Sequence, residues 1–290
     1  MRYRLVQELA ASGVPVAVAC RVLRVSPSGY YEWRDRAPSP RAVADAALSA
    51  QIIEIHAMSR GTYGVPRVHA ELRLGRDIHC GRKRVARLMR LARVHGIVRR
   101  RGKRHRPAPA VHDDLVRRRF IADAPDRLWL TDITEHPTRE GKVYCAAVLD
   151  VYSRRIVGWS IADHLRAELV VDALEMARWR RRPQGTIVHS DRGAQYTSWA
   201  FGHRLRTAGL MGSMGRVASA LDNSMMESFF GTMQRELLDR RTHWPTRREL
   251  GRAIFEWIEA WYNPRRRHTS LGNVSPVDYE RSRQPASPAA

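Results

Sequence analysis

Residues 128–161 read LWLTDITEHPTREGKVYCAAVLDVYSRRIVGWSI, and this stretch decides the fold. It holds three short apolar runs, at 128–134, 143–152 and 156–161, that are separated by polar turns, which is typical of strands. Three strands at this spacing predict an antiparallel meander. Downstream the pattern predicts an α/β order: helices at 167–179, 199–208, 223–238 and 247–261, and short strands at 186–189 and 210–214.

The residues before this stretch predict only helices. Residues 3–34 indicate two or three short helices, compatible with either a helix-turn-helix or a plain helical hairpin. Further helices are expected over about 42–58, from Pro66 in a first helical turn, and over 82–91. We therefore expect a helical, helix-turn-helix-like DNA-binding region over 1–98, a basic linker over 99–122, a core over 123–281 and a disordered tail over 282–290.

Charge is distributed unevenly along the 290 residues. The chain carries 51 Lys and Arg against 29 Asp and Glu, a net charge of +22, of which +17 falls in residues 1–120. This asymmetry predicts that the first part binds a polyanion. The helix at 82–91 places Val85, Leu88 and Met89 on one face. The rest of its surface is basic and is either a DNA contact, which we favour, or merely solvated; its members include Arg82, Lys83, Arg84 and Arg87.

Several classes of protein are excluded by composition. No stretch of 18 apolar residues is present, so no membrane span is expected, and the first residues lack the apolar run of a secretory signal. We expect a cytoplasmic, nucleoid-associated protein. The three cysteines lie far apart and form no CxxC pair, which excludes a disulfide scaffold and a local zinc knuckle.

Three acidic residues stand in unusual surroundings. Asp132 interrupts an apolar strand, Asp191 closes a strand before a glycine turn (HSDRG), and Glu227 flanks an apolar helical stripe. Buried like charges are costly unless they are paired or hold a cation. Two Asp and one Glu without a nearby Cys fit Mg²⁺, with Mn²⁺ as a substitute, and two such ions can clamp the attacking and leaving oxygens of a phosphodiester. We therefore interpret all three as metal ligands and catalytic residues.

The helix that carries Glu227 has two faces. Asn223, Glu227, Gly231 and Gln234 share a small or polar face that could meet substrate. The opposite stripe predicts the core, and its members are Met226, Phe230, Met233 and Leu237.

The flanks WLTDIT, HSDRGAQY and DNSMMESFF, with 35 residues between Asp191 and Glu227, resemble the DDE catalytic core of retroviral integrases and insertion-sequence transposases. The similarity is greatest to the OrfB frame of the insertion sequence family 3 group. Residues 262–276 resemble that group's C-terminal signature, and SGYY (28–31) and YGVPRV (63–68) resemble its N-terminal part. The resemblance covers roughly residues 20–280.

The resemblance implies a ribonuclease-H-like fold, with a mixed five-stranded sheet flanked by helices and preceded by a small all-α basic region. It implies a transposase that cleaves double-stranded DNA at terminal inverted repeats and joins the 3′-hydroxyl to target DNA. It further implies a homo-oligomer on DNA, and an OrfA partner or OrfA fusion.

Two departures from the family pattern leave an alternative open. The group usually carries Lys or Arg seven residues after the catalytic Glu, whereas this chain has Gln234 followed by Arg235. No sustained heptad run precedes the core. A catalytically impaired OrfB that acts as a DNA-binding regulator is therefore the second hypothesis, and a metal-dependent ribonuclease of the same fold is a weaker third.

Secondary site residues are also expected. His189, Asn223, Gln195 and Gln234 could position substrate, although a buried structural imidazole and a helix cap explain His189 and Asn223 equally well. Further DNA contacts are expected at Arg235 and in a C-terminal phosphate patch made of Arg265, Arg266 and His268.

Overall fold

The computed structural model describes residues 2–97, 121–191, 195–214 and 224–283. Most of the predicted linker, residues 215–222, Asn223 and most of the predicted tail lie outside these ranges. The first part of the chain forms helices α1 (Arg2–Ala11), α2 (Val16–Val22), α3 (Pro27–Asp35), α4 (Pro40–Met58), α5 (Val65–Gly75) and α6 (Arg82–Leu91).

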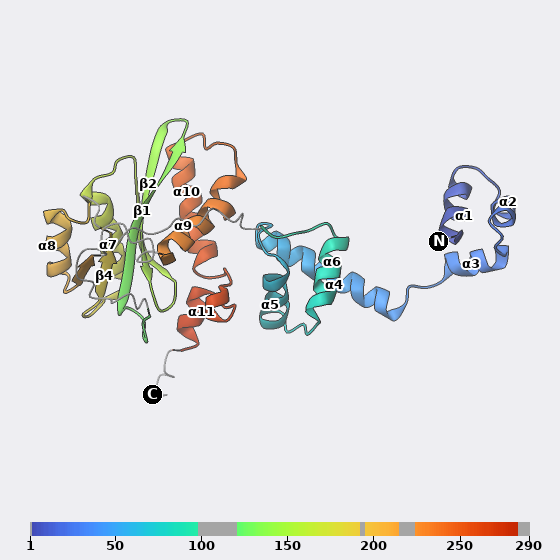
Figure 1. The fold of residues 1–290 in the computed structure, drawn as a ribbon, viewed down its shortest axis with the longest axis horizontal. Coiled ribbons are helices and arrows are strands. Elements are labelled where there is room, and N and C mark those ends of the chain that lie inside the picture. Colours follow the sequence, from blue (N-terminus) through green and yellow to red (C-terminus); the bar gives the residue numbers. More distant parts are fainter. Residues whose placement is uncertain (1, 98–120, 192–194, 215–223, 284–290) are drawn as a thin grey trace, which may run out of the picture.

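The second part of the chain is mixed (Figure 1). Its elements are β1 (Leu128–Thr138), β2 (Gly141–Asp150), β3 (Ile156–Ala162), α7 (Ala167–Arg181), β4 (Ile187–Ser190), α8 (Trp199–Thr207), β5 (Met211–Met214), α9 (Ser224–Glu236), η1 (Leu238–Arg240), α10 (Arg247–Glu256), η2 (Trp257–Tyr262), η3 (Thr269–Leu271) and α11 (Pro276–Arg281). Side-chain hydroxyls accept a hydrogen bond from a backbone N–H at the start of several helices, as helix N-caps do: Ser26, Ser39, Ser198, Thr246 and Ser275.

The five strands form one mixed sheet in the order β3-β2-β1-β4-β5. Strands β1, β2 and β3 pair antiparallel, which confirms the predicted meander. Strand β4 pairs in parallel with β1, and β5 pairs in parallel with β4, each after a crossover helix. The fold class expected from the sequence is therefore confirmed.

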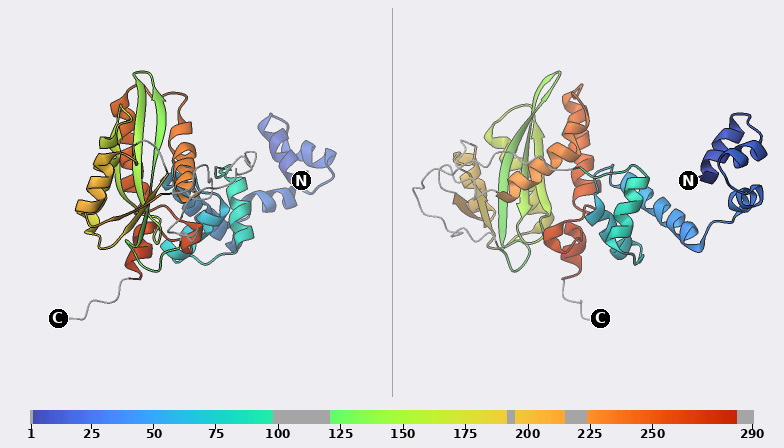
Figure 2. Two further views of the ribbon diagram at one scale, coloured as in Figure 1. Left: turned by 60° about the vertical axis from the view of Figure 1, so that its left-hand side comes forward. Right: turned by 45° about the vertical axis from the view of Figure 1, so that its right-hand side comes forward.

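Alternation along the strands divides the core between two helix layers (Figure 2). Trp129, Ala146 and Val148 face the layer of α7 and α8. Leu128, Leu130 and the opposite residues of β2 face the layer of α9, α10 and η2. Because β2 is covered on both faces, its sequence is a nearly continuous apolar run rather than an alternating one.

Helix α7 lies unusually close to the sheet at Gly158 on β3. A Cβ at this position would stand 2.1 Å from the carbonyl oxygen of Ala173 and 2.7 Å from the nitrogen of Ala177. Only glycine permits this approach. The buried residues of α7 are all apolar, and they are Leu169, Val170, Ala173, Leu174 and Ala177.

The helical part has two units of different character. Helices α1–α3 form their own small core around Val6, Cys20 and Tyr30 and lie at the far end of the molecule (Figure 1). Helices α4–α6 share the larger core cluster with α9, α10 and η2. The region predicted as one unit over 1–98 is thus divided, and its second unit packs on the mixed domain.

The helix predictions were most accurate where apolar residues recur with a clear helical period. Helix α6 covers the predicted residues, and Val85, Leu88 and Met89 are its buried side chains. Met226 and Met233 on α9, and Leu237 directly after it, are buried as expected, but Phe229 is the buried aromatic and Phe230 is only partly covered. Phe229 packs against the rings of Trp257 and Tyr262, which the pattern of α9 alone does not show.

Candidate active site

The parallel pairing of β1 with β4 brings together Asp132, which lies within β1, and Asp191, which directly follows β4. The two strands are parallel neighbours, and Leu130 pairs with His189. Asp132 and Asp191 each follow two residues after that pair. Because neighbouring strands lie about 4.8 Å apart, the two carboxylates stand at equivalent positions on adjacent parts of the backbone.

Glu227 approaches the same edge from the helix layer. Leu128 and Leu130 belong to the core cluster that contains the buried residues of α9. Strand alternation therefore turns Asp132 toward that layer as well. Glu227 lies in the first turn of α9, and α9 packs against β1. We call Asp132, Asp191 and Glu227 the acidic edge.

The acidic edge is electrostatically strained. Burial, with a smaller contribution from the negative charges of Asp191 and Glu227, raises the pKa of Asp132 to about 7. The hydrogen bond that the Ile133 N–H donates to Asp132 Oδ1, at 2.8 Å, partly offsets this effect. Asp132 is half-buried, whereas Asp191 and Glu227 are exposed. Asp191 and Glu227 are therefore each close enough to repel the carboxylate of Asp132.

The donor chemistry of the acidic edge fits a divalent cation. Carboxylate oxygens are the ligands that Mg²⁺ prefers, and a bound cation would cancel the repulsion that raises the pKa of Asp132. In the described residues, however, no three or more His, Cys, Asp or Glu side chains are spaced so that they could hold a metal ion. The exposed side chains of Asp191 and Glu227 are the ones with room to move.

Two of the predicted positioning residues make structural contacts. His189 is buried, and its Nδ1 lies 3.1 Å from Ser213 Oγ on β5, which joins β4 to its neighbour. Gln195 donates from Nε2 to the carbonyl oxygen of Leu165 at 3.3 Å. Tyr196, the next residue, is buried with its hydroxyl 3.3 Å from Thr131 Oγ1, one residue before Asp132.

The end of α9 carries the position that departs from the family pattern. Gln234 is exposed and donates from Nε2 to Asp239 Oδ1 at 2.6 Å. Arg235 is half-buried, and its Nη2 lies 3.5 Å from Thr232 Oγ1. The amide of Gln234 and the guanidinium of Arg235 therefore leave the helix in different directions.

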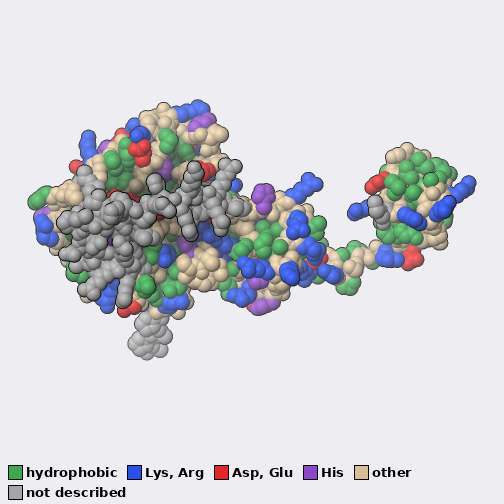
Figure 3. Space-filling model, viewed as in Figure 1, with side chains coloured by type: hydrophobic (Ala, Val, Ile, Leu, Met, Phe, Trp, Pro, Cys, Tyr) green, Lys and Arg blue, Asp and Glu red, His purple; other side chains and the backbone are tan. Residues whose placement is uncertain are grey.

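The basic residues of α6 divide into two groups. Arg82 and Lys83 are exposed. Arg84 and Arg87 both pair with Asp45 on α4, at 2.7 and 2.5 Å. Figure 3 shows Lys and Arg side chains gathered over α4–α6. A DNA contact by α6 would rest first on Arg82 and Lys83, because Asp45 compensates the other two.

The C-terminal phosphate patch expected from the sequence is not an exposed surface. Arg266 is only 5% exposed and forms a buried ion pair with Glu236, with Nη2 and Oε1 2.8 Å apart. His268 is partly covered, with its ring against that of Tyr262. Arg265 is exposed. The sequence could not reveal this correction, because Glu236 stands 30 residues before its partner.

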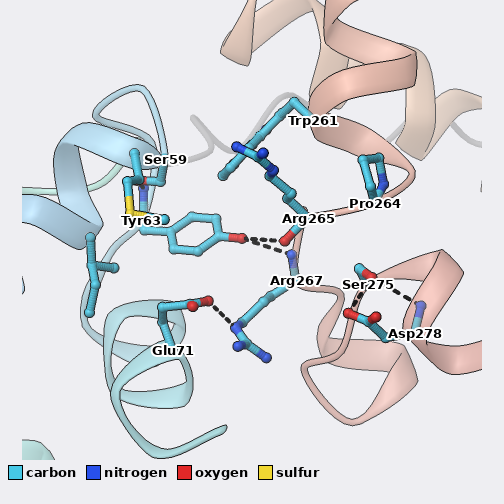
Figure 4. A pocket seen from close by; sticks show the side chains of 11 residues that line it. Ser59, Tyr63, Glu71, Trp261, Pro264, Arg265, Arg267, Ser275 and Asp278 are labelled. Atoms are coloured by element: carbon cyan, nitrogen blue, oxygen red, sulfur yellow. Dashed lines mark hydrogen bonds and ion pairs between the residues drawn. The ribbon is translucent and has the colours of Figure 1, made fainter. Parts of the chain in front are cut away.

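Two motifs that were singled out separately bind each other (Figure 4). The Tyr63 hydroxyl accepts a hydrogen bond from the Arg267 N–H at 2.8 Å and lies 3.4 Å from the Arg265 carbonyl oxygen. The Arg267 guanidinium pairs with Glu71 of α5. These contacts line a cavity of about 260 Å³ between α4–α5 and the segment after η2. They attach the helical unit α4–α6 to the mixed domain, a role that sequence reasoning missed.

Fold and acidic edge together define the integrase-core class of polynucleotidyl transferases. Family models agree: integrase core domains match residues 122–220 and 208–276, and an HTH-like domain matches residues 43–102, which include α4–α6 rather than α1–α3.

Comparisons with individual proteins identify the family within this class. The chain is 37% identical to the transposase for insertion sequence element IS629 of Shigella sonnei over 92% of each chain. It is 34% identical to transposase InsF for insertion sequence IS3A of Escherichia coli, over 97% of this chain and 98% of that one. Among solved structures, the catalytic core domain of HTLV-2 integrase in complex with magnesium matches 55% of this chain and 99% of that chain at 13% identity, with a TM-score of 0.43. The chain belongs to the integrase-core transposases of insertion sequences of the IS3 group.

One further property follows from the helices alone. None in the described ranges combines the length and the apolar character of a membrane span.

Proposed function

We propose that this chain is a DDE transposase that cleaves DNA at the ends of an insertion sequence and transfers the strand to target DNA. Asp132, Asp191 and Glu227 are its catalytic residues and its ligands for divalent metal, Mg²⁺ or Mn²⁺. The observation that supports the proposal is the register of β1 and β4, because Asp132 and Asp191 each lie two residues after the paired residues Leu130 and His189.

Two cations bound at the acidic edge would activate the attacking hydroxyl and stabilise the departing oxygen of the phosphodiester. The chain's own residues prepare this site. The Ile133 N–H orients the Asp132 carboxylate, and the His189–Ser213 contact fixes the strand that ends at Asp191. The first turn of α9 favours the negative charge of Glu227 through the helix dipole. Binding requires the exposed side chains of Asp191 and Glu227 to turn toward Asp132.

The proposed partner is double-stranded DNA, in the form of terminal inverted repeats and target. Arg82 and Lys83 on α6 would contact phosphates, with Arg235 and Arg265 as further exposed or half-exposed cations. Because transposition requires two DNA ends held together, we propose a homo-oligomer on DNA, assisted by an OrfA partner or fusion.

A second function is favoured by Gln234, the neutral residue at a position where the group usually carries a cation. It is a DNA-binding regulator that no longer breaks strands. The two functions differ in one outcome, which is metal-dependent strand cleavage by a protein that binds the same DNA.

The test uses the purified chain, a labelled duplex that carries the terminal repeats flanking its reading frame, and Mg²⁺ or Mn²⁺. We expect nicking and joining that Asp191→Asn lowers by roughly 10²–10³-fold or more, as when a preorganised charged group is lost. The control is Asp172→Asn, an exposed acid on α7, which should leave the rate unchanged. Binding without cleavage by the wild-type chain would support the regulator, and full activity of Asp191→Asn would refute the proposed mechanism.

A further inference from the structure

A second cluster of like charge lies beside α9. Arg67 of α5, Arg154 of the β2–β3 turn, and Arg266 and His268 of the C-terminal segment line one cavity of about 180 Å³. Hydroxyl groups complete the wall, contributed by Ser228, Thr232, Thr269 and Ser270. We call this cavity the arginine pocket. Segments far apart in the sequence converge in it, and none of them predicts it alone.

The arginine pocket holds more positive than negative charge. Glu236 pairs with two of its arginines: Arg266 binds Glu236 Oε1 at 2.8 Å, and Arg67 lies 3.8 Å from the same oxygen. Within the described ranges, no acidic side chain lies within ion-pair distance of Arg154. Three guanidiniums are therefore opposed by one carboxylate.

Burial and the neighbouring charges make this excess of positive charge unfavourable. Burial and the neighbouring Arg266 lower the pKa of the Arg67 guanidinium. Burial and the charges of Arg266, Arg67 and Arg154 hold the pKa of His268 well below its ordinary value of 6.5. An uncompensated cluster of this kind is costly to keep in a folded protein.

Arg154 is also held in an unusual backbone conformation. Its φ is +61°, in the left-handed region that residues other than glycine, Asn and Asp rarely adopt. The turn is fixed by Asp150, which accepts hydrogen bonds from the N–H and the hydroxyl of Ser153 at 2.9 and 3.0 Å. Strained positions that the surroundings maintain tend to mark functional sites. The turn thus presents the Arg154 side chain to the pocket.

We propose that the arginine pocket binds a backbone phosphate of the DNA substrate, with Arg154 as its principal unpaired ligand. This inference rests on the proposed function and adds a binding site to it. The planar guanidinium matches phosphate oxygens, and the hydroxyls that line the wall can donate to the same group.

The position of the pocket fits this role. Ser228, which lines it, directly follows Glu227 on α9. The pocket wall and the acidic edge therefore share the first turns of α9, and the proposal requires that a DNA strand bound at the edge also reaches the pocket. Because Arg67 comes from α5 and the other ligands from the mixed domain, a bound phosphate would also connect the two parts of the protein.

The experiment measures duplex binding by fluorescence anisotropy in EDTA, which removes catalysis, over a range of salt concentrations. Arg154→Gln should weaken binding roughly 10-fold and lower the slope of log K against log salt by about 0.9, the loss of one phosphate contact. Arg154→Lys keeps the charge and should restore most of the slope. The matched control is Arg206→Gln, an exposed arginine on α8, which should leave both quantities near the wild-type values.

A second measurement uses the unmodified protein, in case the Arg154→Gln variant is unstable. DNA should protect Arg154 from phenylglyoxal, as read by mass spectrometry, while Arg206 continues to react. Wild-type affinity and slope in a folded Arg154→Gln variant, or no protection of Arg154 in a protein that binds DNA, would overturn the inference and leave the transposase proposal intact. A wild-type chain that neither binds nor cleaves DNA would instead overturn the proposed function.

Discussion

The acidic edge and the arginine pocket are both clusters of like-charged side chains, but the charge is negative at the edge and positive in the pocket. In each, three side chains of one charge are brought together by segments that are distant in sequence. In each, burial and then the nearby like charges shift a pKa, that of Asp132 at the edge and that of His268 in the pocket. They differ in compensation: the pocket contains a buried counter-charge, Glu236, whereas the described neighbours of Asp132 include no cation. We therefore expect the edge, but not the pocket, to depend on a bound cation under the proposed function, because Glu236 pairs with two of the pocket arginines.

Removing the counter-charge of the pocket should have the largest effect. Glu236→Gln leaves Arg266 buried without its partner and should lower the free energy of unfolding by about 3–5 kcal/mol, measured by urea denaturation. Glu256→Gln is the matched control, because its pair with Arg252 is exposed; we expect a loss below about 1 kcal/mol. Equal losses in the two variants would show that the pocket is not a strained cluster.

Removing one charge from the acidic edge should instead increase the free energy of unfolding. Burial and the other two acids raise the pKa of Asp132 above that of an unfolded Asp, so its ionised form destabilises the folded state, and this cost is present above pH 7. In EDTA at pH 8, Asp132→Asn should therefore raise the free energy of unfolding by about 2 kcal/mol. Asp172→Asn should not. An unchanged or lower stability of Asp132→Asn would contradict mutual repulsion at the edge.

Lowering the pH should destabilise the fold through the buried histidine of the arginine pocket. His268 has a folded pKa well below 6.5, so the unfolded chain binds its proton first, and the stability that neutral His268 contributes is lost as the pH falls below 6.5. Burial lowers the pKa of His136 on β1 to about 4, so His136 also reduces the stability of the fold as the pH falls. Thermal unfolding between pH 7 and 5 should thus be less pH-dependent in His268→Gln than in the wild type.

The exposed His203 supplies the control for this measurement. His203→Gln should keep the wild-type pH dependence. If His268→Gln and His203→Gln behave alike, His268 is not held neutral by the arginine pocket.

The smallest expected effect concerns the exposed cations of α6. Substitution of both Arg82 and Lys83 by Ala should lower the salt slope of DNA binding by at most about 1.8 without changing the stability of the fold. An equal slope in this variant and the wild type would show that α6 is a solvated helix and that the pocket carries more of the DNA contact.

Much of the fold could be predicted because it depends on local pattern. The apolar period of α6 and α7 specified their buried faces, and the alternation of short apolar runs specified the meander. The acidic residues were found because Asp132 interrupts an apolar strand. The convergence of the three acids remained an expectation, because it depends on which strand pairs with β1.

Long-range pairs could not be predicted. Arg266 looked like part of a phosphate patch because its partner, Glu236, lies on another helix. Tyr63 and Arg267 bind each other across 204 residues, so each motif appeared unexplained when considered alone. Phe229 was missed for a similar reason, since its neighbours Trp257 and Tyr262 belong to η2. In each case a partner far along the chain determines whether the side chain is buried.

The most direct test of the central claim is to locate the metal ion. Fe²⁺ binds oxygen-ligand sites of this kind and, with ascorbate and peroxide, cuts the backbone beside it. We predict cuts near residues 132, 191 and 227 in the wild-type chain, suppressed by excess Mg²⁺ and lost together in Asp132→Asn. Cuts at other positions, or a pattern that Asp132→Asn leaves unchanged, would contradict a shared metal site at the acidic edge.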